Sequence, residues 1–444
     1  MSANSMNRRH FLNTSVGLSL AGTAASALAN EDDVEKTVTA ARIKANETIQ
    51  HARNVGLDIL KPTKKQLEHG LELHANSLVF DSYGFSPRAA LDGDLLREAI
   101  EANASDLEIE DMREDMSMTR CVTDIAEQVE YQEAWIASGV DCVFQNAGQE
   151  GQDPMRLIKR LARFTFVTDF LKDFVIKAAV PEDIEQARKD GKRSLYFTGN
   201  GVPLTQQWVS VWDELRYLKI FFQLGIRMMH LTYQRRNMIG DGCAEKANAG
   251  LSDFGRTVVQ EMNKVGVIVD CAHSGWQTSL EAAQTSEKPM VASHSICGDI
   301  FPHIRSKPDD VISAIADTGG YIGICCISRF LRGKGDINAL LDHIDHVVKK
   351  FGVEHVAIGT DVAYTSRNAS TESKKVPRRS RSRKHWRSLW PADPFVTTPA
   401  ARTSISWTNW PLFTVGLVQR GYSDEQIQKI IGGNVMRVSQ DVLS

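Results

Sequence analysis

Short apolar and β-branched segments alternate with amphipathic segments from about residue 77 to the end of the chain. Each apolar segment has the length of one buried strand and is bounded by polar or turn-forming residues. The eight segments are Ser77–Ser82, Val140–Gln145, Ser194–Thr198, Met228–Thr232, Val267–Cys271, Met290–Ser293, Gly320–Cys326 and His355–Gly359. Helix-like segments lie between them, such as Gln206–Leu224, Asp253–Val265, Asp309–Ala316 and Asp336–Phe351. Eight parallel βαβ units predict an α/β fold of the (β/α)8 TIM-barrel type rather than an open doubly wound sheet.

The predicted barrel, residues 76–444, carries several additions. Residues 30–75 form a charged and helical lead-in, and insertions lie near residues 91–118 and 366–405. Within the second insertion, residues 367–387 contain nine Lys or Arg against one Glu. This basic segment is either a solvated loop or a lid or anion-attracting rim, since loops after barrel strands open onto the face where barrel active sites lie.

The first 29 residues have the pattern of an export signal. Arg8 and Arg9 precede Phe11-Leu12, an uncharged stretch over residues 13–27 and the small-residue run ending at Ala29. This order predicts a twin-arginine signal peptide that is cleaved after Ala29, and therefore a periplasmic or otherwise exported protein. The apolar stretch is shorter than the roughly 20 residues of a membrane span, so we expect no span in the mature chain, with an uncleaved anchor as the alternative.

Composition narrows the classes of function. The 444 residues are 42% hydrophobic and 24% charged, with a formal net charge of -3, so no general attraction to nucleic acid or anionic lipid is expected. The seven cysteines are an odd number without paired CxxC spacing, which predicts neither a zinc ribbon nor a disulfide framework.

Candidate chemistry lies where strands end, because side chains at the carboxyl ends of barrel strands converge on one mouth. His273 follows the fifth strand and His294 lies in the end of the sixth, 294 − 273 = 21 residues later, so their imidazoles can converge on one divalent ion. Asp361 follows the eighth strand and is a candidate metal ligand or general base. Arg305 is a candidate bidentate partner for a substrate carboxylate.

Several motifs occur in a consistent order along the chain. Residues 236–243 read RNMIGDGC, residues 250–255 GLSDFG, residues 269–274 VDCAHS, residues 293–295 SHS, residues 359–361 GTD and residues 432–438 GGNVMRV, and Arg305 precedes PDD at 308–310. Together these motifs resemble the renal, or membrane, dipeptidase family from about residue 75 onward. The resemblance implies a periplasmic-type metallopeptidase that cleaves dipeptides, tolerates a D-residue on the carboxyl side, often forms homodimers and uses two zinc ions. It also implies an HxD zinc-binding pair at strand one, a zinc-binding histidine each at strands five and six, and a bridging glutamate at strand three.

The chain departs from this family pattern at the site itself. Tyr83 and Phe85 stand at the HxD positions, Gly199 stands where the bridging glutamate is expected, and Tyr233 replaces a histidine that contacts the tetrahedral intermediate in the family. A two-metal site is therefore not expected, and His273, His294 and Asp361 supply three ligands at most, enough for one zinc ion or none.

Three interpretations follow from these residues. The first is an exported hydrolase of dipeptides or a related small amide, with His273 and His294 on the metal, Asp361 and Tyr233 as catalytic residues, and Arg305 and Tyr83 binding substrate. The second is a non-catalytic family member that acts as a periplasmic binding or maturation protein. The third is a metal-free enzyme that uses Asp361 with Tyr83 or Tyr233. Whether Asp361 approaches the histidines or pairs with Arg305 separates the first interpretation from the second.

Overall fold

The computed structural model describes residues 31–148, 153–378 and 393–443. The chain divides into a small unit, residues 1–41, and a large one, residues 42–444. The described residues of the small unit belong to helix α1 (Glu31–Ala45), and the predicted signal peptide lies outside the described residues. All features below belong to the large unit.

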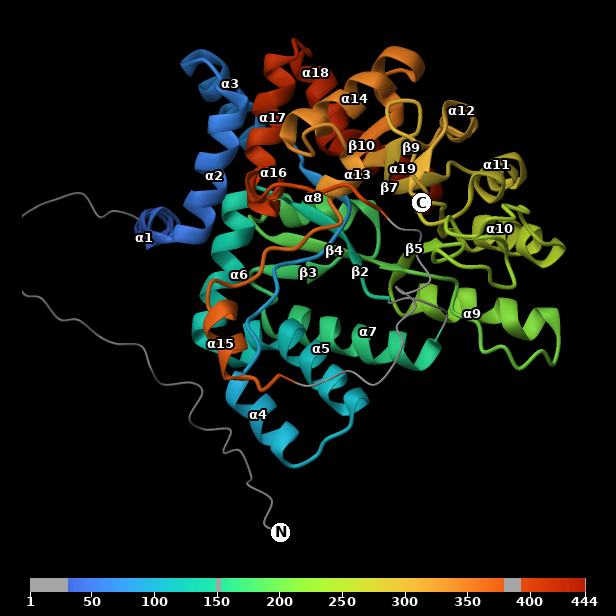
Figure 1. Cartoon of the computed structure of the whole chain (residues 1–444), viewed down its shortest axis with the longest axis horizontal. Coiled ribbons are helices and arrows are strands. Elements are labelled where there is room, and N and C mark those ends of the chain that lie inside the picture. Colours follow the sequence, from blue (N-terminus) through green and yellow to red (C-terminus); the bar gives the residue numbers. More distant parts are fainter. Residues whose placement is uncertain (1–30, 149–152, 379–392, 444) are drawn as a thin grey trace, which may run out of the picture. The chain divides into compact units, whose positions relative to one another are not determined.

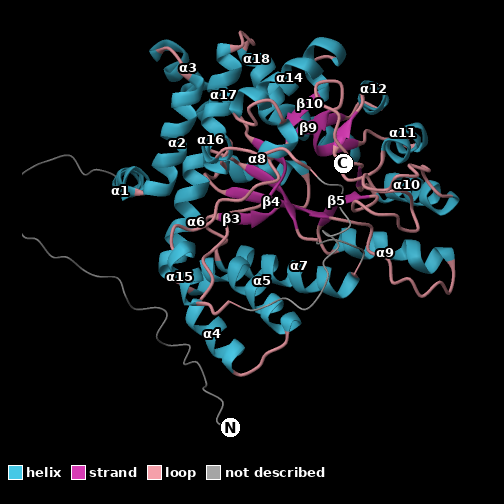
Figure 2. Ribbon diagram, viewed as in Figure 1, coloured by secondary structure: helices cyan, strands magenta, loops and turns pink. Residues whose placement is uncertain are grey.

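Eight parallel strands form a nearly closed barrel at the centre of the large unit. In spatial order they are β1 (Phe80–Gly84), β2 (Cys142–Asn146), β4 (Arg193–Gly199), β5 (Ile226–His230), β6 (Ile268–Asp270), β7 (Val291–Cys297), β9 (Tyr321–Ile324) and β10 (Val356–Ile358). Figure 2 shows these strands inside a ring of helices. The predicted TIM barrel is thereby confirmed, and each of the eight predicted segments overlaps one of these strands.

Two short strands lie off this path, β3 (Val175–Lys177) beside β4 and β8 (Ser306–Lys307) beside β7. The sequence pattern did not predict them, because segments of two or three residues show no periodicity. The barrel closes between its first and last strands, where the amide of Asp361 donates to the carbonyl of Tyr83 at 2.9 Å and a parallel bridge joins Arg88 to Thr365.

Most of the helices follow one another around the barrel in sequence order, whereas α19 packs against its amino-terminal end (Figure 1). They are α2 (Glu47–Leu60), α3 (Lys64–Asn76), α4 (Gly93–Glu101), α5 (Asp106–Thr123), α6 (Ile125–Ser138), α7 (Pro154–Phe170), α8 (Pro181–Lys189), α9 (Val211–Gln223), α10 (Asp253–Val265), α11 (Trp276–Thr285), α12 (Asp309–Asp317), α13 (Ser328–Leu331), α14 (Ile337–Phe351), α15 (Ala369–Lys375), α16 (Pro399–Ser404), α17 (Trp410–Gln419), α18 (Asp424–Gln428) and α19 (Asn434–Leu443). Short turns η1 (Val353–His355), η3 (Trp407–Asn409) and the π-helical η4 (Lys429–Gly433) join some of them. None of the helices in the described ranges is long and apolar enough to cross a membrane.

Helix α9 begins later than the sequence pattern predicts. The prediction began it at Gln206, but Ser210 is its N-cap and accepts a hydrogen bond from the amide of Asp213. The preceding amides of Gln206, Gln207 and Trp208 instead donate to the Glu214 carboxylate at 2.8–3.1 Å. A side chain reaching back to these amides competes with helical hydrogen bonding, which is why the first residues stay outside the helix.

The additions to the barrel are packed elements. Helices α2 and α3 of the lead-in bury residues such as Ile49 and Leu73, and α3 packs on α17. The first insertion forms α4 and α5, and α5 packs on α6 and α7. The described part of the basic segment contains α15, where Lys375 pairs with Asp94 of α4 at 2.8 Å, while residues 379–387 lie outside the described residues.

The amino-terminal end of the barrel is closed by side chains and by the last helix. Phe80 stacks on Phe144 with 5.2 Å between ring centroids, and helix α19 adds apolar residues to the same cluster. The side-chain amide of Asn434 donates to the carbonyls of Val353 and Val356, both at 2.7 Å. The motif at 432–438 therefore anchors this helix beneath β10. All seven cysteines are free.

Candidate functional site

Two histidines predicted as metal ligands lie together inside the barrel mouth. The Nε2 atoms of His273, just after β6, and His294, on β7, are 2.8 Å apart. Burial, with a further contribution from Arg305, lowers the pKa of both imidazoles well below its ordinary value, so both are neutral at pH 7. Nδ1 of His294 lies 2.9 Å from Oγ of Ser293, whereas Nδ1 of His273 is buried without a hydrogen-bond partner.

A third histidine, His230 at the end of β5, completes this cluster and was missed by the sequence analysis. Its ring centroid lies 5.1 Å from that of His273 and 5.3 Å from that of His294. Its Nε2 is 2.6 Å from Oδ2 of Asp270, and both side chains are fully buried. Tyr233 follows the predicted strand and fitted the strand-end rule, whereas His230 lies within the strand.

Asp270 is a buried carboxylate with many donors. Its Oδ1 accepts from the amides of Ala272 at 2.8 Å and Ser293 at 3.1 Å, and its Oδ2 accepts from the Ser293 hydroxyl. Burial raises the pKa of Asp270, but His230 and the hydrogen bonds outweigh burial, so the pKa lies below its ordinary value and the group stays ionised. Asp270 lies within the VDCAHS motif, but the sequence analysis selected only residues at strand ends and therefore passed over it.

The two tyrosines pack against the histidines. The Tyr83 ring stacks on His294 with centroids 3.8 Å apart, and its hydroxyl donates to Oδ1 of Asn200 at 2.6 Å. Burial, together with the nearby Asp361, raises the pKa of the Tyr83 hydroxyl, which therefore remains protonated. Tyr233 stacks on His273 with centroids 4.3 Å apart. Both rings thus form walls of the site, and the proton of Tyr83 is already committed to Asn200.

Asp361 lies at the barrel mouth in a left-handed backbone conformation, with φ of 56°. Burial raises its pKa to about 6, against the opposing influence of Arg305, His230 and Arg88. Its carboxylate does not belong to any group of three or more potential ligands within 4.8 Å of one another among the described residues. Arg305 and His230 nevertheless lie near enough for their positive charges to oppose the rise in its pKa.

Arg305 is buried, at 2% exposure, and its guanidinium donates to the carbonyls of Ala272 and His294. These bonds fix the backbone that carries the histidines. Arg88, which the sequence analysis did not select, is an exposed cation whose charge acts on Asp361. Its guanidinium lies 4.5 Å from the centre of the Phe85 ring, so the loop after β1 supplies a positively charged group near Asp361.

Comparison with known proteins places this barrel in a family. The profile of the membrane dipeptidase family (peptidase family M19) matches residues 71–377. The chain belongs to the membrane dipeptidase family. Dipeptidase verJ of Clonostachys rogersoniana is 28% identical over 228 residues, which cover 51% of this chain and 50% of verJ, so the chain spans about half the length of this curated relative.

Solved structures agree with the membrane dipeptidase fold. An amidohydrolase from Pseudomonas aeruginosa superposes with a TM-score of 0.62 at 25% identity, covering 84% of this chain and 98% of that one. The probable dipeptidase PvdM from the same organism superposes with a TM-score of 0.61 at 20% identity, covering 86% of this chain and 99% of that one. The second likeness concerns the fold alone.

The two-zinc centre expected of a membrane dipeptidase does not fit the residues present. Tyr83 and Phe85, in edge contact at 6.1 Å between centroids, replace the first ion's ligands with aromatic rings. Gly199 offers no carboxylate, although a Cβ at this position would meet only the carbonyl of Gly201 at 3.2 Å. These residues supply no ligands for a bridged pair of ions, although there is room for a larger side chain at Gly199.

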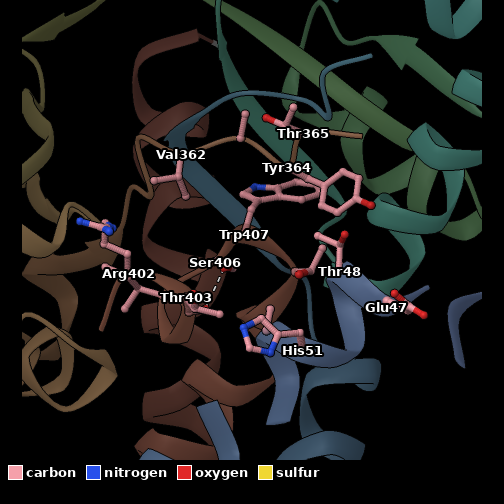
Figure 3. Close-up of a pocket in the computed structure, with 14 residues that line it drawn as sticks. Glu47, Thr48, His51, Val362, Tyr364, Thr365, Arg402, Thr403, Ser406 and Trp407 are labelled. Carbon is pink, nitrogen blue, oxygen red and sulfur yellow. Dashed lines mark hydrogen bonds between the residues drawn. The ribbon is translucent and has the colours of Figure 1, made fainter. Parts of the chain in front are cut away.

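An open cavity of about 630 Å³ lies beside the loop that follows Asp361 (Figure 3). It is lined by Glu47, Thr48, His51, Ala52, Val362, Ala363, Tyr364, Thr365, Arg402, Thr403, Ile405, Ser406, Trp407 and Thr408. The Trp407 indole on its wall donates to Oδ2 of the buried Asp81 at 3.1 Å. None of the clustered histidines lines it, so this cavity and the histidine cluster are separate features.

Proposed function

We propose that this membrane dipeptidase family member hydrolyses dipeptides or a related small amide at the barrel mouth, with at most one metal ion. The observation that carries the proposal is Asp361, a carboxylate at the end of β10 whose pKa is raised to about 6. Such a group is mostly ionised at neutral pH and is a stronger base than an ordinary aspartate. Family membership supports the reaction class.

In the proposed reaction, Asp361 takes a proton from water while the water oxygen attacks the amide carbon. The carbon–nitrogen bond then breaks, and the amine leaves with that proton. Arg88 is the exposed cation near Asp361 and is proposed to hold the substrate carboxylate, while buried Arg305 supplies positive potential and fixes the histidine backbone. Tyr83 and Tyr233 form the apolar walls.

The test is release of free amino acids from L,L- and L,D-dipeptides by the purified protein. Asp361→Asn is expected to lower kcat/KM at least ~100-fold, the usual contribution of a general base. Asp317→Asn, an exposed carboxylate on α12, is the matched control and should match the wild type. Equal turnover by Asp361→Asn and wild type would contradict the assigned base.

A second candidate function is a non-catalytic binding or maturation protein. The aromatic substitution of the first-metal ligands favours it, because Tyr83 and Phe85 fill the family's catalytic position without supplying ligands. Saturable binding of a dipeptide without turnover of any dipeptide in the panel would support this function over hydrolysis.

We also propose that the protein works outside the cytoplasm and binds a small dipeptide-like ligand rather than nucleic acid, with a homodimer as the expected assembly. Export rests on Arg8 and Arg9 in the amino-terminal pattern. Replacing both with lysine should retain the protein in the cytoplasmic fraction, whereas unchanged export would exclude the twin-arginine route. Sedimentation of the purified protein measures the assembly state.

A further inference from the structure

We propose that His230, Asp270 and His294 form a binding site for one divalent first-row metal ion inside the barrel. This set shares only His294 with the ligands expected from the family. The proposal does not rest on hydrolase activity, because metal binding is measured without a substrate.

The three side chains come from adjacent strands. His230 and Asp270 are directly paired in the parallel register of β5 and β6, and His294 lies on β7 beside them. One potential ligand atom from each residue lies within 4.8 Å of the other two, and all three side chains are fully buried. Bonds of about 2.0–2.2 Å place two ligands of one tetrahedral ion roughly 3.3–3.6 Å apart, so any pair at the upper end of this range moves closer when the ion binds.

His230 provides the independent sign of a missing partner. It is fully buried, and its Nδ1 has no hydrogen-bond partner. Its Nε2 lies 2.6 Å from Oδ2 of Asp270, and this contact lowers the pKa of that carboxyl, so the missing partner is at Nδ1. An unsatisfied buried polar group costs about 1–3 kcal/mol, and coordination to an ion removes that cost at one nitrogen.

Neighbouring groups hold the other two ligands as a metal site requires. The amides of Ala272 and Ser293 fix Oδ1 of Asp270, while Oδ2 accepts from the Ser293 hydroxyl and also faces His230. A ligating histidine normally donates its other N–H to a fixed acceptor. Nε2 of His273 lies 2.8 Å from Nε2 of His294 and is placed to be that acceptor, which leaves Nδ1 of His294 to bind the ion in place of its 2.9 Å contact with Oγ of Ser293. His273 is therefore assigned as a positioning residue and not as a ligand.

Two imidazoles and one carboxylate define the class of ion. This donor set suits Zn²⁺ and Fe²⁺ and disfavours Mg²⁺ and Ca²⁺, which take oxygen ligands. The ion would connect β5, β6 and β7 at the mouth, and it would neutralise the buried charge of Asp270.

The test compares metal content across matched variants. The purified protein is loaded separately with Zn²⁺, Co²⁺ and, anaerobically, Fe²⁺, desalted and analysed by mass spectrometry of the metals. We expect about one ion per chain in the wild type and less than a tenth of that in His230→Phe and Asp270→Asn. His273→Gln keeps an acceptor for the His294 N–H and should retain the ion with the wild-type Co²⁺ absorption spectrum.

Circular dichroism checks that each variant folds. If His230→Phe or Asp270→Asn does not fold, the Co²⁺ spectrum of folded His273→Gln decides, since an unchanged spectrum excludes His273 as a ligand. No bound metal in the wild type with any of the three ions overturns the site. Loss of the ion in His273→Gln with retention in His230→Phe also overturns it. A protein that binds the ion but cleaves no dipeptide would contradict the proposed function and leave this site standing.

Discussion

At the scale of single residues, burial sets the chemistry of this barrel mouth. Asp361 combines a pKa of about 6 with a strained left-handed backbone, while the buried imidazoles of His273 and His294 stay neutral. A left-handed non-glycine residue is held only where surrounding structure enforces it, and such residues cluster at functional sites. These two features together support the proposed role of Asp361 as the base.

The pH dependence of activity tests this assignment. Because a base must be ionised, kcat/KM should fall as the pH drops below about 6 and reach a plateau above it. The raised pKa of Asp361 affects the stability of the fold in the opposite direction. Its stabilising contribution is complete below the ordinary aspartate pKa and is lost as the pH rises through about 6. Asp361→Asn should therefore be more stable than the wild type at pH 8 by roughly 1–2 kcal/mol. A less stable variant would contradict the raised pKa.

Asp81 gives a second residue-scale prediction. Burial raises its pKa to about 7, although Thr360 donates to it through both its amide, at 2.9 Å, and its hydroxyl, at 2.6 Å. Thr360→Val removes the hydroxyl at nearly constant volume and should cost about 1.5–3 kcal/mol of unfolding free energy, measured with denaturant at pH 8. The raised pKa makes the loss greater as the pH rises through 7, because the ionised form needs the donor. Exposed Thr371→Val is the control, and an equal effect of the two variants would contradict this account.

At the scale of elements, the sequence predicted what depends on local periodicity. The eight strands follow from apolar segments, whereas β8, with two residues, has no such signature. The predicted start of α9 was wrong because the Glu214 carboxylate accepts hydrogen bonds from amides that precede the helix. A pattern of hydrophobic positions does not show such a contact.

The sequence could predict only those residues of the candidate site that stand at the carboxyl ends of strands. His273 and His294 were found because they follow this rule, and the structure places them together. His230 was missed because its role depends on a contact with the neighbouring strand. The register of β5 and β6 brings Asp270 beside it. Likewise, the partners of Arg305 are backbone carbonyls, which have no sequence signature.

The first insertion gives an element-scale prediction. Glu114 of α5 pairs with Arg156 at 2.7 Å, Arg160 at 3.1 Å and Arg163 at 3.2 Å, all on α7. Burial raises the pKa of Glu114, but the three arginines outweigh burial and hold it below its ordinary value. Its contribution to stability is therefore present above the ordinary carboxyl pKa and is lost as the pH falls.

Glu114→Gln should lower the free energy of unfolding by about 2 kcal/mol at pH 7, since three partly buried cations lose their shared partner. The difference from wild type should shrink below pH 4. Thermal melts across pH measure both effects, with exposed Glu98→Gln as the control. A difference that does not change with pH would exclude the ionic origin.

At the scale of the whole molecule, the chain keeps the barrel and the structural motifs of the membrane dipeptidase family but has different residues at the expected zinc-ligand positions. The family profile covers residues 71–377, and the closing motif anchors α19 under the barrel. The expected two-zinc ligands are instead Tyr83, Phe85 and Gly199. Retained scaffold motifs beside these three residues support the proposal of at most one metal ion.

The most direct test of this account is the number of zinc ions per chain, counted by native mass spectrometry after loading with excess zinc and desalting. We predict no more than one ion per chain, because the described ligands cannot build the bridged pair. Two tightly bound ions per chain would contradict the account, since they would require ligands at the first-metal position that this structure does not supply.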